Sequence, residues 1–160
     1  MFRRFAPESK AAVAEARAVA RRAGSRTVEA EHLLLALAGG NGDPAAAALR
    51  DAGLDADRIA AALKEEASHS LAAAGLAIID DERHPCPTPP SGSTPDWGPS
   101  AKAALGRAVK EAKLRGHRCL GPEHVLLGVL HSRYGRVSRT LDVAGVSRVE
   151  LFADVCSRLN

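Results

Sequence analysis

The chain repeats itself, and this repeat constrains its fold more than any other feature. The segment AEHLLLAL at residues 30–37 returns as PEHVLLGV at residues 122–129, so Glu31 and Glu123 stand 92 positions apart. A shift of 92 positions without gaps also brings together Pro7 and Pro99, Lys10 and Lys102, Gly24 and Gly116, and the Ala-Gly steps at 52–53 and 144–145. We therefore expect two equivalent structural units.

Composition favours helices in both units. The hydrophobic fraction is 46%, but aromatic residues make up only 3%. The core must then be built from alanine, leucine and valine, and few β-branched or aromatic residues alternate with the period of two that marks a strand. The sequence predicts an all-α fold, with two four-helix units in a pseudo-twofold arrangement.

The predicted helices are bounded by proline and glycine. Glycine after the first and third helix of each unit suits a left-handed C-cap, and Pro122 suits a first helical turn. The expected helices of the first unit are 8–23, one from about 30, 44–52 and 55–67. Those of the second unit are 100–115, one from about 122, 136–144 and 147–159.

A segment rich in proline, glycine and serine joins the units. The stretch HPCPTPPSGSTPD at 84–96 has the composition of a linker, and LAAAGLAIID at 71–80 is compatible with a further short helix. We expect the first repeat at 1–66, a connecting segment at 67–96 and the second repeat at 97–160, together forming one compact domain.

Charge and cysteine content indicate a cytoplasmic protein. The net charge is +3, and no apolar run approaches the ~20 residues of a membrane span. No secretory signal opens the chain, because charged residues and Pro7 interrupt it before any apolar run develops. The three widely spaced cysteines, Cys86, Cys119 and Cys156, suit free thiols in a reducing compartment.

The two Glu-His pairs are the first candidate sites. In a first helical turn, Glu31 and Glu123 interact favourably with the helix dipole, while His32 and His124 can turn inward and hydrogen-bond across the connection between helices. Alternatively, a carboxylate beside free backbone N–H groups can receive a cation while the amides receive an anion. Both interpretations remain open at this stage.

No pattern indicates catalysis or a metal. His117, Cys119, His124 and His131 cluster in the sequence, but their spacing fits no standard zinc site. No lysine follows a glycine as in a phosphate loop, and no G-x-S-x-G step appears. We expect no catalytic residue, no metal and no cofactor.

The opening MFRRFAPESK, with EHLLLAL and then GPEHVLLGVL, resembles the amino-terminal domain of Clp-family (Hsp100) unfoldases, especially the ClpC type. The resemblance implies an eight-helix module that precedes ATPase rings and receives substrates and adaptors. In some members this module binds phosphorylated arginine, and in actinobacterial members it binds cyclic peptide antibiotics.

Several departures from the family pattern favour a diverged, free-standing relative without ATPase rings. The linker between the units is longer and richer in proline than is usual. Ala6, Thr27 and Cys119 replace family residues that carry hydroxyl groups near the two Glu-His pairs.

Two sets of ligand-binding residues follow from the repeat and the resemblance. In one hypothesis, Glu31 and Glu123 hold a guanidinium group while Arg26, Arg118 or helix amides bind an attached phosphate. In the other, a hydrophobic groove lies between the amino-terminal edges of the units. By resemblance the groove residues are Phe2, Lys10, Val13, Trp97, Lys102 and Leu105, with Arg17 and Gly106 departing from the family there.

Three functions are compatible with these features. The leading one is a non-enzymatic module of the Clp system that binds peptide-like ligands, acting as an adaptor or as a decoy for ligands of the ClpC amino-terminal domain. The second is the substrate- and adaptor-receiving domain of a complete unfoldase. The third, nucleic-acid binding, is disfavoured because a solvated helix surface explains the basic residues Arg21, Arg22, Arg26, Lys110, Lys113, Arg115 and Arg118.

Overall fold

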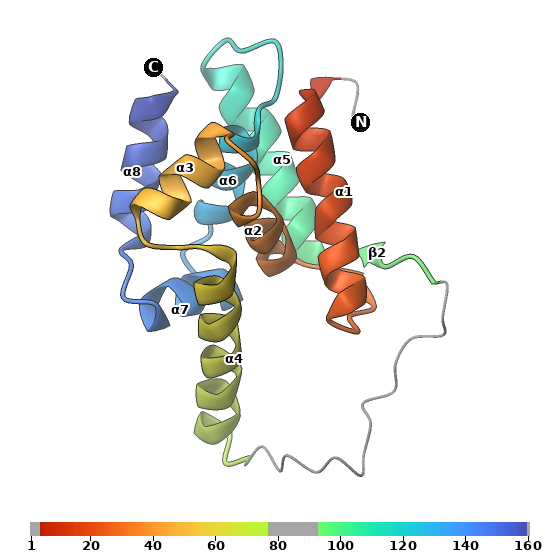
Figure 1. Ribbon diagram of the computed structural model, residues 1–160, viewed down its shortest axis with the longest axis vertical. Helices are drawn as coiled ribbons and strands as arrows, with labels where there is room; N and C mark the ends of the chain where they lie inside the picture. The colour runs from red at the N-terminus through yellow and green to blue at the C-terminus, as the bar shows by residue number, and fades with distance from the viewer. Residues whose placement is uncertain (1–3, 77–92, 160) are drawn as a thin grey trace.

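The computed structural model describes residues 4–76 and 93–159, and these residues form eight helices and two very short strands (Figure 1). The helices of the first repeat are α1 (Pro7–Arg22), α2 (Ala30–Ala38), α3 (Pro44–Asp51) and α4 (Ala56–Ala73). Those of the second are α5 (Pro99–Leu114), α6 (Pro122–Leu130), α7 (Arg136–Val143) and α8 (Arg148–Arg158). The predicted all-α fold of two four-helix repeats is confirmed.

The register of 92 residues holds at the start of every helix. Each helix of the second repeat begins 92 positions after its counterpart, and the first three pairs also end in register. The fourth pair differs, because α4 has 18 residues and α8 has 11. The expected end of this helix near residue 67 was wrong, because α4 continues to Ala73. The rest of the proposed extra helix and most of the linker lie outside the described residues.

Local sequence explains where the helices begin and end. The side chain of Asp43 accepts a hydrogen bond from the backbone N–H of Ala46 at 2.8 Å and so caps α3. Asp55 caps α4 in the same way. Gly24 and Gly116 follow α1 and α5 with φ values of 68° and 72°, the left-handed conformation that glycine adopts without strain.

Each repeat contributes a short extended segment to the other. Strand β1 (Thr27–Val28) precedes α2 and pairs in parallel with β2 (Asp96–Trp97), which precedes α5. The shifted pairing is also present, because Phe5 before α1 forms a parallel bridge with Leu120 before α6. The same kind of parallel pairing therefore joins the two repeats at two equivalent places.

Helix packing follows the same exchange. The central helices α2 and α6 contact each other and bury most of their side chains. At the periphery α3 packs on α8 and α4 on α7, so the third helix of each repeat meets the fourth helix of the other. A single hydrophobic cluster runs through both repeats, and α4 projects beyond the body of the molecule (Figure 1).

A polar network fixes the starts of α2 and α5 against each other. The carboxylate of Glu29 accepts hydrogen bonds from the backbone N–H and the hydroxyl of Ser100, and that hydroxyl accepts one from the backbone N–H of Ala30 at 2.9 Å. These bonds pair amide groups that a helix start would otherwise leave without partners. A Cβ at Gly98 would lie 1.8 Å from Oε1 of Glu29, so a side chain there would displace this carboxylate.

No helix in the described part of the chain is long and apolar enough to cross a membrane.

Helices α5 and α6 approach each other closely at Gly128. A Cβ added at Gly128 would lie 2.1 Å from the backbone oxygen of Ala104, whereas a Cβ at Gly106, also within a helix, would meet nothing within 4 Å. The two glycines thus form a matched pair. One permits contact between backbones, and the other only lowers helix propensity.

We expect Gly128→Ala to destabilise the protein by roughly 1–3 kcal/mol, because α6 must move away from α5. Gly106→Ala should instead stabilise it by up to about 1 kcal/mol, since alanine is the better helix former. Urea denaturation followed by circular dichroism measures both free energies of unfolding. A Gly128→Ala variant as stable as Gly106→Ala would contradict this account of the contact.

Candidate functional site

A pocket of about 280 Å³ lies between α1 and the segment that precedes α5. Its lining residues are Lys10, Val13, Ala14, Arg17 and Trp97. The guanidinium carbon of Arg17 lies 5.0 Å from the ring centre of Trp97, a cation–π contact. Because Trp97 belongs to β2, pairing between the repeats holds the indole ring over α1.

The structure brings together part of the predicted groove. Lys10, Val13 and Trp97 share this pocket, but Lys102 and Leu105 lie on α5 and do not line it. Leu105 is buried in the core and Lys102 is exposed. Phe2 lies outside the described residues.

Both histidines of the Glu-His pairs face inward. Nδ1 of His32 accepts the backbone N–H of Glu29 at 2.9 Å, and Nδ1 of His124 accepts that of Gly121 at 3.0 Å. Nε2 of His124 also lies 2.8 Å from Nδ1 of His117, in the connection between α5 and α6. The predicted inward turn is confirmed for both histidines, and the predicted hydrogen bond across the connection is confirmed for His124, whereas His32 bonds the first residue of its own helix start.

This geometry keeps both rings neutral. A ring nitrogen that accepts an N–H cannot carry a proton, so the proton of neutral His124 resides on Nε2 and is donated to His117. Burial, together with His117 and Arg115, lowers the pKa of His124 from 6.5 to about 4. Burial also lowers the pKa of His32.

The carboxylate of Glu31 already holds a guanidinium group. Nη1 of Arg136, at the start of α7, lies 3.0 Å from Oε1 of Glu31, and the glutamate is 7% exposed. Arg136 also bonds the buried Glu66 of α4 at 3.2 Å, and Arg139 bonds Glu66 at 2.7 Å. An ion-pair network therefore links α2, α4 and α7.

The pKa of Glu66 reflects this network. Burial alone would raise it, but hydrogen bonds from Ser70, Arg139 and Arg136 outweigh burial and hold the pKa below its usual value. The carboxylate is thus charged at neutral pH and fixes α4 to α7.

Glu123 differs from Glu31 in its surroundings. Its side chain is 17% exposed, and no arginine or lysine of the described residues lies within ion-pair distance. In the first repeat, the position equivalent to Arg136 is occupied by Pro44, which is uncharged. Oε1 of Glu123 lies 3.7 Å from Nδ1 of His124, and its carboxylate, unlike that of Glu31, has no guanidinium partner among the described residues.

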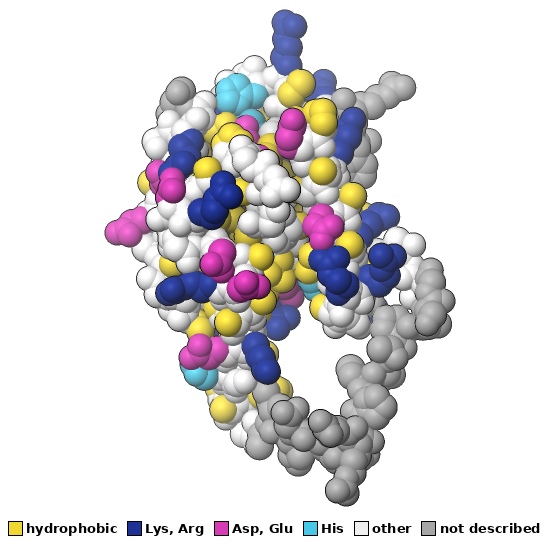
Figure 2. Space-filling view, in the orientation of Figure 1, with side chains coloured by type: hydrophobic (Ala, Val, Ile, Leu, Met, Phe, Trp, Pro, Cys, Tyr) yellow, Lys and Arg dark blue, Asp and Glu magenta, His cyan; other side chains and the backbone are white. Residues whose placement is uncertain are grey.

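Arg26 and Arg118 are both exposed, and neither bonds a glutamate of a Glu-His pair. Acidic and basic side chains intersperse over the face drawn in Figure 2. Among residues 4–76 and 93–159, no group of three or more histidine, cysteine, aspartate or glutamate side chains is placed to hold a metal ion.

Comparison with known proteins decides the family. The Clp repeat (R) N-terminal domain family matches residues 4–144. The chain belongs to this family. The resemblance drawn from the sequence is confirmed.

Several Clp proteins are similar to this chain. The negative regulator of genetic competence ClpC/MecB of Bacillus subtilis is 30% identical over 147 residues, which cover 92% of this chain but 16% of that protein. An uncharacterized protein of Mycobacterium bovis is 31% identical over 99% of this chain and 54% of its own length. The chain thus spans about half or less of these relatives.

Solved structures agree on the fold. The N-terminal domain of the chaperone ClpD from Arabidopsis thaliana superposes with a TM-score of 0.74 at 22% identity, covering 99% of this chain and 96% of that one. The Hsp104 N-terminal domain from Candida albicans gives a TM-score of 0.64 at 16% identity, covering 94% and 88%.

Sequence reasoning missed three features of this Clp repeat domain. It did not foresee the stacking of Arg17 on Trp97, the ion pair between Glu31 and Arg136, or the exposed Tyr134 beside that pair. The ion pair could have been suspected by comparing the repeats, because Arg136 stands where the first repeat has Pro44.

The neutral His124 predicts a pH-dependent stability. The folded state disfavours the protonated ring, so the His124 contribution is complete above pH 6.5 and is lost as the pH falls toward 4, by up to about 3 kcal/mol. His32 acts in the same direction. Urea denaturation across this range measures the loss.

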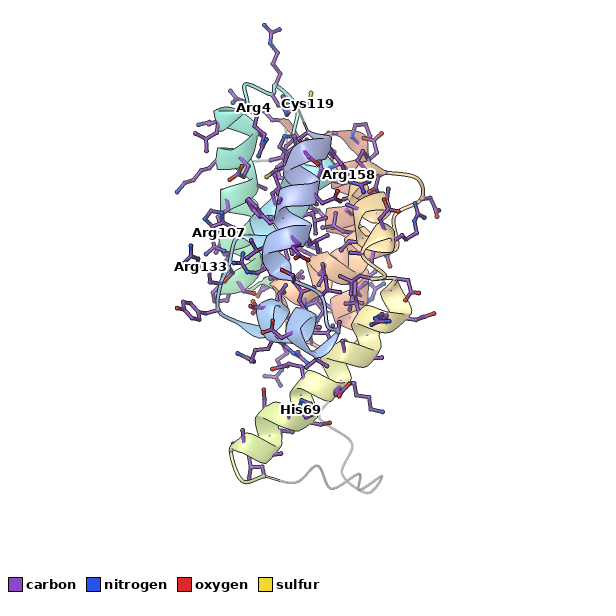
Figure 3. The ribbon with its side chains drawn as sticks, turned by 90° about the vertical axis from the view of Figure 1, so that its left-hand side faces the viewer. Arg4, His69, Arg107, Cys119, Arg133 and Arg158 are labelled. Carbon is purple, nitrogen blue, oxygen red and sulfur yellow. The ribbon has the colours of Figure 1, made fainter. Side chains whose placement is uncertain are left out.

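Asparagine offers an acceptor at position 124 but does not titrate, so His124→Asn should flatten the stability profile between pH 6.5 and 4. His69 is exposed on α4 (Figure 3), and His69→Asn should leave the profile unchanged. A profile equally steep in wild type and His124→Asn would show that another group governs acid sensitivity.

Proposed function

We propose that this Clp repeat domain is a non-enzymatic, cytoplasmic module of a Clp protein-degradation system and that it binds peptide-like ligands in the Trp97 pocket. The single observation that carries the proposal is the composite nature of this pocket. Its wall is α1 of the first repeat, and its aromatic ring comes from the second repeat.

The chemistry of the pocket suits a peptide. Val13, Ala14 and the indole of Trp97 offer apolar contacts, while Lys10 and Arg17 supply donors for backbone carbonyls or a carboxylate. By its likeness to the ClpC type, the ligands proposed include cyclic peptide antibiotics and degradation substrates. The module would act as an adaptor, or as a decoy that sequesters ligands of the ClpC amino-terminal domain.

The second candidate is a receiving domain for substrates and adaptors within a longer unfoldase. The length of the relatives favours it, since the match covers only 16% of ClpC/MecB. The length of the gene separates the two candidates, because an ATPase sequence continuing after Asn160 requires the second and a stop codon there excludes it.

A subsidiary proposal concerns phosphorylated arginine. Glu123 would bind the guanidinium group, with helix amides or Arg118 on the phosphate. At Glu31 the guanidinium group of Arg136 already occupies the corresponding position. We therefore assign the guanidinium site to Glu123 rather than to both glutamates.

Trp97→Ala should weaken binding of a cyclic peptide of the ClpC-directed class by at least about tenfold, or ~1.4 kcal/mol. In the unmutated protein, Trp97 fluorescence should change on binding, because the indole contacts the ligand. Val149 is 65% exposed on α8, and Val149→Ala should bind as wild type does. Equal affinity in both variants would place the ligand elsewhere.

Calorimetry with phosphoarginine should show one site, abolished by Glu123→Ala and retained in Glu31→Ala, because Arg136 fills the latter position. Loss of binding in Glu31→Ala alone would reverse this assignment. Absence of heat with the unmutated protein would end the phosphoarginine proposal and leave the Trp97 pocket untouched.

A further inference from the structure

A second groove lies where α5, α6 and the loop before α7 meet. It has a volume of about 290 Å³, and we call it the basic groove. Its apolar wall includes Ala103, Val129 and Val137, and Arg107 and Tyr134 line its outer part. Two carboxylates line it as well: Glu31 is paired with Arg136, and Glu29 accepts hydrogen bonds from the hydroxyl groups of Thr27 and Ser100. It is separate from the Trp97 pocket, with which it shares no lining residue.

The first repeat carries a related groove with a different set of charges. The counterpart, which we call the acidic groove, lies between α1 and the end of α2 and has a volume of about 370 Å³. Ala103 and Ala104 correspond to Ala11 and Ala12 in its wall. At its rim Glu15 stands at the position of Arg107, and Asp43 precedes the position of Arg136.

The charges of the acidic groove are largely satisfied within the chain. Glu15 bonds Arg22 at 2.6 Å, and Asp43 caps α3 by accepting from the backbone N–H of Ala46. Glu8 also lines this groove, and its exposed carboxylate has no such partner among residues 4–76 and 93–159.

Two arginines at the edge of the basic groove keep their charge available. Arg107 and Arg133, from α5 and the loop between α6 and α7, lie on the same edge of the molecule in Figure 3. Neither side chain has a hydrogen bond or ion pair with another residue in 4–76 or 93–159. Tyr134 follows Arg133 and is 87% exposed. Unpaired guanidinium groups beside an exposed aromatic ring form a surface that favours carboxylates and an apolar side chain.

We propose that the basic groove is a docking site for an acidic peptide segment of a partner protein. Carboxylates of that segment bind Arg107 and Arg133, and a neighbouring apolar side chain packs on Tyr134 and the wall of the groove. Arg136 keeps its hydrogen bonds to Glu31 and Glu66, so it lines the groove but does not bind the peptide. This inference is independent of ligand binding at Trp97.

A fluorescent peptide that alternates glutamate with leucine tests the proposal by anisotropy. The Arg107→Glu, Arg133→Glu double variant should weaken binding by roughly tenfold or more, and Tyr134→Ala should weaken it measurably. The matched control is Arg50→Glu, which reverses an exposed charge on α3, and it should leave the affinity within about twofold. Thermal melts establish that each variant is folded.

Three results would overturn the proposal. The first is equal affinity in wild type and the double arginine variant. The second is binding that Arg50→Glu weakens as much, because attraction would then follow net charge alone. The third is self-association through Tyr134, seen by sedimentation and abolished by Tyr134→Ala, because the occupant would then be a second copy of this chain. Loss of the Trp97 site in the same protein would leave the basic groove unaffected.

Discussion

The exchange of extended segments between the repeats is the constraint on which the structure depends. Val28 pairs with Trp97, and the residues at the equivalent positions of the other repeat, Leu120 and Phe5, pair in the same way. Each of these pairings joins one repeat to the other, and the two repeats bury one common hydrophobic core. The same pairing holds Trp97 over α1. Because β1 and β2 lead directly into α2 and α5, it also brings Glu29, before α2, within hydrogen-bond distance of Ser100 at the start of α5.

The repeats share a backbone plan and differ in charge. Glu31 and Glu123 occupy equivalent helix starts, but only the first has an internal guanidinium partner. The grooves beside α1 and α5 likewise share several equivalent lining positions, but one has Glu15 where the other has Arg107. Duplication thus supplied two copies of each surface, and substitution at a few rim positions gave the copies different chemistry.

Much of the fold was predictable from the sequence, because glycine, proline and the repeat act locally. Pro122 and Gly116 mark helix boundaries that the structure has within a residue or two. The end of α4 was not predictable in this way: residues 69–73 are exposed and follow Glu66, whose partners are distant in sequence. Glu66 is fixed by Arg136 and Arg139, 70 or more residues away. The site was predicted only in part for the same reason, because side chains such as Arg17 take their partners from the fold.

The most direct test of the account is a residue-resolved NMR titration with a cyclic peptide ligand of the ClpC-directed class. The account predicts that the largest amide and indole shifts occur at Lys10, Val13, Ala14, Arg17 and Trp97, with contributions from both repeats. A pocket of about 350 Å³ between α3 and α8, lined by Asp51, Glu150 and Arg158, is the clearest alternative. Shifts confined to that pocket, with Trp97 unmoved, would contradict the central claim.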